Sequence, residues 1–404
     1  MAKTVYVLSK RESSLMIILS YIAVFLLIAV TKGSIPYTFH PKAWWLVFVS
    51  VAFGVRLNSS KLKWHSSLLY LLLISFMMIF TSIYNDSFDT DFIQFILYGI
   101  FSFIIIGSFT LDTFKHYFLN VVFGISILSI VIFITSFYTH LPLKYMENEY
   151  VSIGYYMFQA IEWNNEPLNR NTGIFTEPGC FQYCLNYALL LYLDDIVNHN
   201  IGKLTRFKLL VVVITLITCA STAGYIVLML IILYVVYKVY EKNIFKLVFI
   251  GIPLGILSIG ALYSSEMVSE KLDEDNKDIS VIMRTADAFA MMEMISDHPF
   301  VGNGGIGTKK YQSRVVGYGA MTAGTGASNG VLVAMAVLGL LWLPLYCYYC
   351  GKACKRMFST APAWFVVILT LLIHSNEYFI FSPIIYIFIF PYKTIGTINN
   401  SLSK

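Results

Sequence analysis

The chain has 404 residues, of which 57% are hydrophobic and only 13% are charged, with a mean hydropathy of +0.70 and a formal net charge of +5. This balance excludes an ordinary soluble globular protein, because such proteins are about one quarter charged. Apolar runs of bilayer length recur with little polar interruption, and this pattern predicts a multi-pass membrane protein.

The predicted spans are helical and number about twelve. The first lies near residues 15–31 and follows a basic start, and we interpret it as a retained helix because no convincing small-residue cleavage site follows. The others fall near residues 43–55, 66–83, 92–110, 117–138, 179–194, 208–221, 223–240, 245–263, 328–349, 363–378 and 381–396. We therefore expect an all-α polytopic membrane protein that forms a single transmembrane domain over residues 1–404.

Basic residues predict the orientation of these spans, because Lys and Arg beside a span resist translocation. Most of the 28 basic residues fall in short segments on the side of the amino terminus, such as those around Arg56, Arg206 and Arg356. That side is predicted to be cytoplasmic and to hold both termini. The opposite side carries two long loops, at residues 139–178 and 264–327.

The short basic segments offer no element large enough to bind ATP or a sugar nucleotide, so soluble nucleotide substrates are not expected. Long loops in compact proteins are usually functional or disordered, and the unusual polar residues gather in the two outer loops. The six cysteines lie mostly in apolar settings, and no His or further Cys completes a zinc ligand set. We therefore predict no metal site.

The first outer loop ends in a charged motif that runs directly into a span, Arg-Asn-Thr-Gly-Ile-Phe-Thr-Glu-Pro at residues 170–178. Pro178 marks a helix start, where unpaired backbone N–H groups favour an anion. Arg170 carries a planar guanidinium with five donors, which suits phosphate. The alternative is a structural ion pair between Arg170 and Glu177 that fixes the loop.

The second outer loop opens with an acidic stretch and then takes a helical period over residues 282–294, with Arg284 near its start. A glycine-rich basic stretch follows and contains Lys309, Lys310 and Arg314. Backbone N–H groups in such a segment can cradle a phosphate, and a mobile surface loop is the alternative.

A further pair of ionisable residues, His374 and Glu377, falls near the end of the span at 363–378, at the predicted outer water interface. Ionisable side chains are costly in or beside a membrane span, so their presence at this position calls for a structural or functional explanation. Because the two residues are three apart they share a helix face, so they could pair with each other, position a substrate or move a proton. Capping of the helix is the structural alternative.

These features together resemble the bacterial O-antigen polymerase (Wzy) family, within the superfamily that also contains the O-antigen ligases. The motif that ends the first long loop, at residues 170–178, is the most specific of them. Supporting features are Ser-Thr-Ala-Gly at 221–224, between two paired spans, and Arg284 followed by His298-Pro299.

The resemblance implies an enzyme in the bacterial inner membrane that acts at the periplasmic face. It would transfer a glycan from undecaprenyl diphosphate to the terminal sugar hydroxyl of another lipid-linked repeat unit, without a cofactor or a metal. The implied partners are the undecaprenyl-diphosphate-linked oligosaccharide, membrane lipids and a chain-length regulator protein, with no nucleic acid.

The same resemblance assigns roles to the charged residues. Cations must meet the charge that builds on the departing diphosphate, and Arg170 and Arg284 are the first candidates, with Arg314 and then the two lysines after them. Glu177 is the first candidate for the base that takes the acceptor proton. His374 and Glu377 are the second candidates.

Two alternative functions remain open at this point. O-antigen ligases of the superfamily carry a His-Asn pair before the span that follows the second long loop, whereas this chain has Ser328-Asn329 there, which favours a polymerase. A flippase or transporter for lipid-linked sugars would also suit twelve spans with both termini inside. Such proteins usually contain two related halves, and the sequence has no evident internal repeat.

Overall fold

The computed structural model describes residues 14–31, 33–58, 66–86, 90–147, 152–243, 279–304, 329–376 and 381–393, together with positions 245, 253 and 314. Most of these residues are helical, which confirms the predicted fold class. The helices before the first long loop are α1 (Ser14–Ala29), α2 (Ile35–Phe39), α3 (Pro41–Asn58), α4 (Ser67–Tyr84), α5 (Thr90–Ser108) and α6 (Leu111–Tyr138). Those after it are α7 (Pro178–Leu191), α8 (Leu193–Val197), α9 (Lys203–Thr218), α10 (Thr222–Tyr240), α13 (Ile279–Asp297), α15 (Gly330–Leu338), α16 (Trp342–Met357), α17 (Ala363–His374) and the 3₁₀ helix η1 (Pro383–Phe388).

Three of the described helices, α4, α6 and α10, are long and apolar enough to cross a bilayer. Shorter apolar helices include α1, α17 and residues 92–108 of α5. The structure thus agrees with a polytopic membrane protein. The predicted span at 245–263 lies almost entirely outside the described residues.

Two predicted spans differ from the structure. The run at 328–349 is divided between α15 and α16, because Gly339 turns the chain with φ +86° and approaches the backbone of Phe300 so closely that an added Cβ would lie 2.3 Å from its carbonyl oxygen. The run at 381–396 forms η1 rather than an α-helix, with Pro383 as its first residue.

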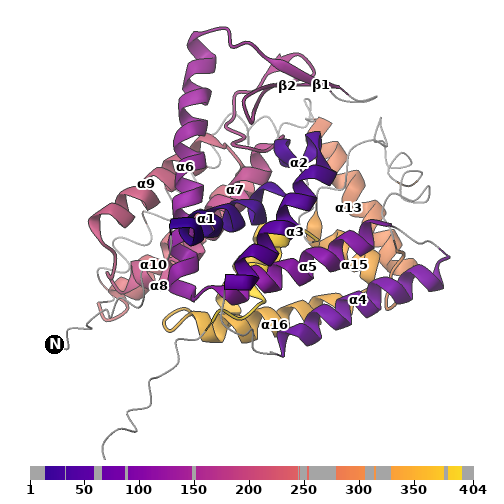
Figure 1. Cartoon of the computed structure of the whole chain (residues 1–404). Coiled ribbons are helices and arrows are strands. Elements are labelled where there is room, and N and C mark those ends of the chain that lie inside the picture. The colour runs from indigo at the N-terminus through magenta and orange to yellow at the C-terminus, as the bar shows by residue number, and fades with distance from the viewer. Residues whose placement is uncertain are drawn as a thin grey trace, which may run out of the picture.

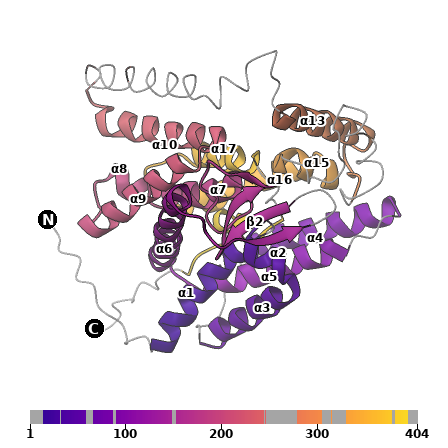
Figure 2. The same ribbon diagram turned by 90° about the horizontal axis from the view of Figure 1, so that it is seen from above.

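The helix α7 is the centre of the assembly. It is contacted by α6, α9, α10 and α17, which surround it in Figure 2, and all of its residues from Cys180 to Leu191 are buried. A helix that is buried on all sides holds a fixed position, so the residues at its amino-terminal end are well placed to form a rigid site.

The first long loop contains a small antiparallel sheet, which the all-α prediction did not include. Its strands are β1 (Lys144–Glu147), β2 (Ser152–Tyr156), β3 (Gln159–Trp163) and β4 (Glu166–Pro167), in the order β1-β2-β3-β4. Asn164 and Asn165 connect the last two strands with φ of 51° and 64°, as a two-residue hairpin turn requires. The buried face of the sheet packs against Ile35 of α2, and Figure 1 shows both elements at the top of the molecule.

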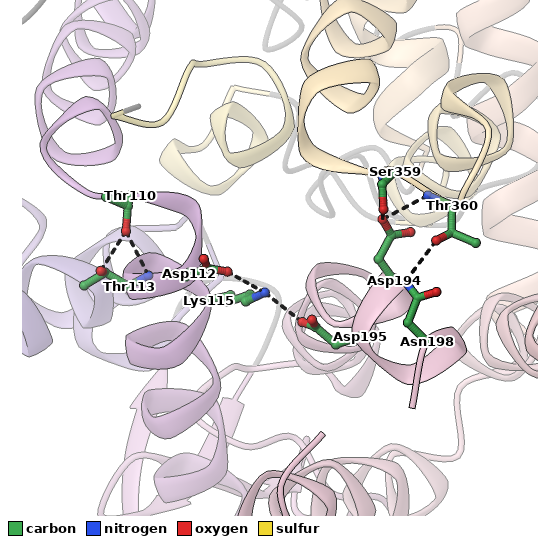
Figure 3. Close-up of polar contacts among 9 residues, drawn as sticks. All are labelled: Thr110, Asp112, Thr113, Lys115, Asp194, Asp195, Asn198, Ser359 and Thr360. Carbon is green, nitrogen blue, oxygen red and sulfur yellow. Dashed lines mark hydrogen bonds and ion pairs between the residues drawn. The ribbon is translucent and has the colours of Figure 1, made fainter. Parts of the chain in front are cut away.

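Contacts between distant segments gather at two ends of the helical assembly. At the end with the sheet, the backbone N–H of Ile35 donates to the carbonyl of Ile174 at 2.9 Å, and that of Asn171 donates to Thr218 at 3.0 Å. At the other end, shown in Figure 3, Lys115 forms an ion pair with Asp195 at 2.7 Å. The two partners of each contact are predicted to lie on the same side of the membrane.

Candidate active site

The segment that carries the Arg170–Glu177 motif is fixed by the buried side chain of Asn171. Its amide nitrogen donates to the hydroxyl groups of Ser129 on α6 and Thr218 on α9, at 3.1 and 3.0 Å, and its carbonyl oxygen accepts from the N–H of Gly173 at 3.0 Å. Gly173 has φ +58°, and a Cβ there would lie 2.6 Å from the ring of Phe181. The loop therefore enters α7 along a defined path.

Glu177 lies at the N-cap position of α7, immediately before Pro178, so the predicted helix start is confirmed. Its side chain accepts no capping hydrogen bond from the backbone of the helix. The backbone before it is held to the segment between α1 and α2, since the N–H of Thr176 donates to the carbonyl of Gly33 at 2.9 Å. The backbone thus fixes the position of this residue, while its carboxylate does not cap the helix.

Glu177 lies within electrostatic reach of Arg284 on α13, rather than of Arg170. Both side chains keep solvent-exposed surface. The protein packed around Glu177 limits its hydration and raises the pKa of its carboxyl group, while the positive charge of Arg284 acts in the opposite direction and lowers that pKa.

Arg170 points to a neighbouring helix instead. It lies within electrostatic reach of Tyr225, in the first turn of α10. The amino-terminal ends of α10 and α7 are close together, because a Cβ on Gly224 would lie 3.1 Å from the side chain of Gln182. Two helix amino termini that meet in this way favour a negatively charged ligand through their helix dipoles, in addition to the cap that Ser221 gives to the N–H of Gly224.

The guanidinium groups of Arg170 and Arg284 make no hydrogen bond or ion pair within the part of the chain that the structure describes. The alternative of a structural Arg170–Glu177 ion pair is therefore not what the structure contains. Among the described residues neither guanidinium is held in a hydrogen-bonded ion pair, and such groups near helix amino termini can bind phosphate oxygens.

Arg314 differs from these two arginines because α13 already neutralises its charge. Its Nη2 lies 2.5 Å from Asp297 Oδ2, and its Nε lies 3.5 Å from Glu293 Oε2. The structure thus places this side chain against two carboxylates of α13. The other basic candidates of the second loop, Lys309 and Lys310, lie outside the described residues.

His374 lies in the interior rather than at the water interface where the sequence placed it. Its side chain has no exposed surface, and its ring nitrogens lie 2.5 Å from the hydroxyl of Tyr183, 2.9 Å from that of Tyr346 and 3.2 Å from that of Tyr187. The physical reason is that the end of α17 packs between α7 and α16, where the tyrosines satisfy the imidazole. In this arrangement the imidazole is enclosed by the three tyrosines instead of being presented at the outer surface. Its predicted partner Glu377 is outside the described residues.

No group of three or more His, Cys, Asp or Glu side chains in a metal-binding arrangement occurs within the described ranges. The six cysteines are free thiols, and all of them except Cys347 are buried.

Sequence reasoning missed the residues that hold the site together. From the sequence alone, Asn171 has no assigned role, although it lies within the motif. The tyrosines of α7 look like ordinary residues of an apolar span. One signal was available, because Tyr183 and Tyr187 are four residues apart and therefore share a helix face. Their histidine partner, almost 200 positions later, had no local signal.

Residues 207–347 match a family model described as O-antigen ligase. The match begins within α9, after Glu177, and it includes Arg284. Searches of curated proteins and of solved structures gave no match. Residues 207–347 are therefore similar to the O-antigen ligase family, and this similarity supports a membrane enzyme of the type that acts on lipid-linked glycans.

Proposed function

We propose that this protein is a polysaccharide (O-antigen) polymerase. It transfers a glycan from undecaprenyl diphosphate to the terminal sugar of another lipid-linked repeat unit, at the periplasmic face of the inner membrane. The observation that carries this proposal is the electrostatic interaction between Glu177, at the end of the first long loop, and Arg284, in the second. A candidate base, Glu177, and a candidate phosphate-binding residue, Arg284, thus come from two distant segments to the same candidate site.

The proposed reaction exchanges one C–O bond at the anomeric carbon for another and transfers one proton. The acceptor hydroxyl attacks the anomeric carbon of the donor glycan, and its proton passes to Glu177. The bond from that carbon to the diphosphate oxygen breaks, and the lipid diphosphate leaves with the electron pair. Arg284 and Arg170, with the N–H groups at the starts of α7 and α10, stabilise the charge that develops on the leaving group.

The environment of Glu177 suits the role of a general base. A base works best when its pKa is close to the working pH while enough of it remains ionised. Burial raises the pKa of Glu177, and the nearby charge of Arg284 limits that rise. Arg284 thus serves both the diphosphate and the ionisation of the base.

The position that favours a polymerase over a ligase lies before α15. Asn329 is the N-cap of that helix, and its side-chain oxygen accepts a hydrogen bond from the N–H of Leu332 at 3.1 Å. The residue before it is a serine, where the resemblance gives ligases a histidine. We propose that this chain carries its base on the first loop instead.

The proposal includes both termini in the cytoplasm and a chain-length regulator as a protein partner. The regulator would adjust the length of the product without contributing to the chemistry. The substrate is membrane-bound, so the protein and both of its glycan substrates share the same bilayer.

The banding of lipopolysaccharide from a deletion strain tests this function. Loss of a polymerase leaves core that carries a single repeat unit, and plasmid-borne wild-type protein restores the ladder. Bare core with accumulated lipid-linked polymer would identify a ligase instead. An unchanged ladder would contradict a role in O-antigen synthesis.

A further inference from the structure

An apolar groove lies at the end of the molecule opposite the candidate active site. Its walls come from α7, α9 and α10 and include Leu189, Leu209, Val213 and Val235, and its volume is about 320 Å³. Two basic side chains, His199 and Arg206, also line it. A groove with apolar walls and basic residues among its lining fits a ligand with an apolar chain and an anionic end.

Within the part of the chain that the structure describes, no carboxylate neutralises the positive charge of Arg206. This residue is exposed in the first turn of α9, and its side chain makes no hydrogen bond or ion pair within the described ranges. The two nearby carboxylates of α8 are already engaged, as Figure 3 shows. Asp194 accepts hydrogen bonds from the N–H groups of Thr360 and Ala361, both at 3.1 Å, and Asp195 pairs with Lys115.

The surface around Arg206 has the composition of a membrane–water interface. Leu204, Phe207 and Leu210 are each more than half exposed on the same helix, and Lys203 is exposed at its start. Exposed apolar side chains interleaved with basic ones are typical of segments at the headgroup level of a bilayer. The groove therefore opens where a lipid headgroup and its chains meet.

We propose that this groove binds one anionic glycerophospholipid, with an acyl chain along the apolar walls and the phosphodiester at Arg206. Basic pockets between membrane helices bind anionic headgroups in this way. A zwitterionic lipid is expected to bind this groove less tightly, because its own cation competes with Arg206 for the phosphate. The inference does not depend on the catalytic proposal, since Arg206 begins α9 whereas the end of that helix, at Thr218, contacts Asn171.

Lipid titration of the purified full-length chain tests the inference. The protein is held in phosphatidylcholine nanodiscs, phosphatidylglycerol is added stepwise, and bound lipid is counted by native mass spectrometry. We expect phosphatidylglycerol to bind in preference to phosphatidylcholine. Arg206→Gln should weaken that binding about fivefold, the effect of one cation at a membrane surface. The matched control Lys242→Gln removes an exposed lysine just after α10, outside the groove, and should bind as the wild type does.

A second variant tests the groove without changing its charge. Val213→Trp fills the space between the walls and should also reduce phosphatidylglycerol binding. Equal weakening by Arg206→Gln and Lys242→Gln would overturn the proposal in favour of general surface charge. Wild-type binding by Val213→Trp would overturn it by excluding the groove, and displacement of the lipid by millimolar inorganic phosphate would indicate a simple anion site instead.

Discussion

At the scale of single residues, the environment of Glu177 decides the chemistry that the site can perform. A carboxylate at a helix start would ordinarily stay ionised and be a poor base. Here the protein packed around the carboxylate raises its pKa, and Arg284 opposes the increase. Each effect can be removed separately, because Arg284 belongs to a different element.

The first prediction concerns the pH dependence of Arg284→Gln. Removal of the positive charge lets the pKa of Glu177 rise further, and a general base is active only when deprotonated. The acid limb of the kcat profile should therefore move to higher pH, and the plateau should fall about 100-fold as the diphosphate loses a cation. The profile is measured with purified enzyme and a synthetic lipid-linked repeat unit.

Lys144→Gln, which removes an exposed cation on β1, is the control for general charge effects. Its profile should match the wild type. An acid limb that stays in place in Arg284→Gln, or moves to lower pH, would show that Arg284 does not act on the base.

A second prediction at this scale concerns His374. Replacement by Phe keeps most of the volume but removes the hydrogen-bond partner of the buried tyrosine hydroxyls on α7 and α16. We expect a stability loss of about 1–3 kcal/mol, the cost of leaving buried polar groups unpaired. Thermal unfolding in detergent measures it, with exposed Tyr348→Phe on α16 as the neutral control. An unchanged melting temperature for His374→Phe would contradict the structural role.

At the scale of elements, the join between α13 and α15 depends on a close approach of two backbone segments. The N–H groups of Asn303 and Gly304 donate to the carbonyls of Ala336 and Val337, at 2.8 and 3.2 Å. Gly302 makes this possible with φ +78°, and a Cβ there would lie 2.1 Å from the carbonyl oxygen of Val337. The position of Arg284 on α13 therefore depends on a glycine about twenty residues away.

Gly302→Ala should accordingly destabilise the join. The strained backbone alone costs about 1–3 kcal/mol, and the contact with Val337 adds to it. The matched control is Gly124→Ala on α6, where an added Cβ meets nothing within 4 Å. There the substitution should be neutral or stabilising by up to about 1 kcal/mol. Equal melting temperatures for both variants would contradict this interpretation of the join.

The elements also show what the sequence could and could not predict. The helical period at 282–294 correctly anticipated α13, and Pro178 correctly marked the start of α7, because both signals are local. The break between α15 and α16 depends on a contact between Gly339 and Phe300, and the electrostatic interaction of Glu177 with Arg284 joins segments about a hundred residues apart. Such contacts leave no trace in hydrophobic periodicity. The sheet had local signals, the alternation in β2 and the Asn-Asn turn, but its strands are short enough to be read as loop.

At the scale of the whole molecule, hydrogen bonds between distant segments form within two groups of loops, one predicted on the outer side of the membrane and one on the inner side. Segments predicted on the outer side contact each other, as Asn85 does with the carbonyl of Gly302 at 3.0 Å. Segments predicted on the inner side do the same, since the N–H of Lys393 donates to the carbonyl of Phe109 at 2.7 Å. The alternation read from hydropathy thus agrees with the packing, and charge bias supplies the proposed orientation.

Single cysteines test that orientation. Glu166→Cys, exposed on β4, should react with a membrane-impermeant maleimide in cells with a permeabilised outer membrane, whereas Lys242→Cys should react only after lysis. The background should be low, because five of the six native cysteines are buried. Labelling of Lys242→Cys in unlysed cells would reverse the proposed topology.

The most direct test of the central claim is polymer formation by the purified protein in liposomes that contain only the undecaprenyl-diphosphate-linked repeat unit. We expect a ladder of lengthening products from the wild type and from Lys144→Gln, and none from Glu177→Gln or Arg284→Gln. A wild-type ladder from either of those two variants would contradict the proposed site. Transfer that occurs only when lipid A core is added as acceptor would contradict the polymerase itself.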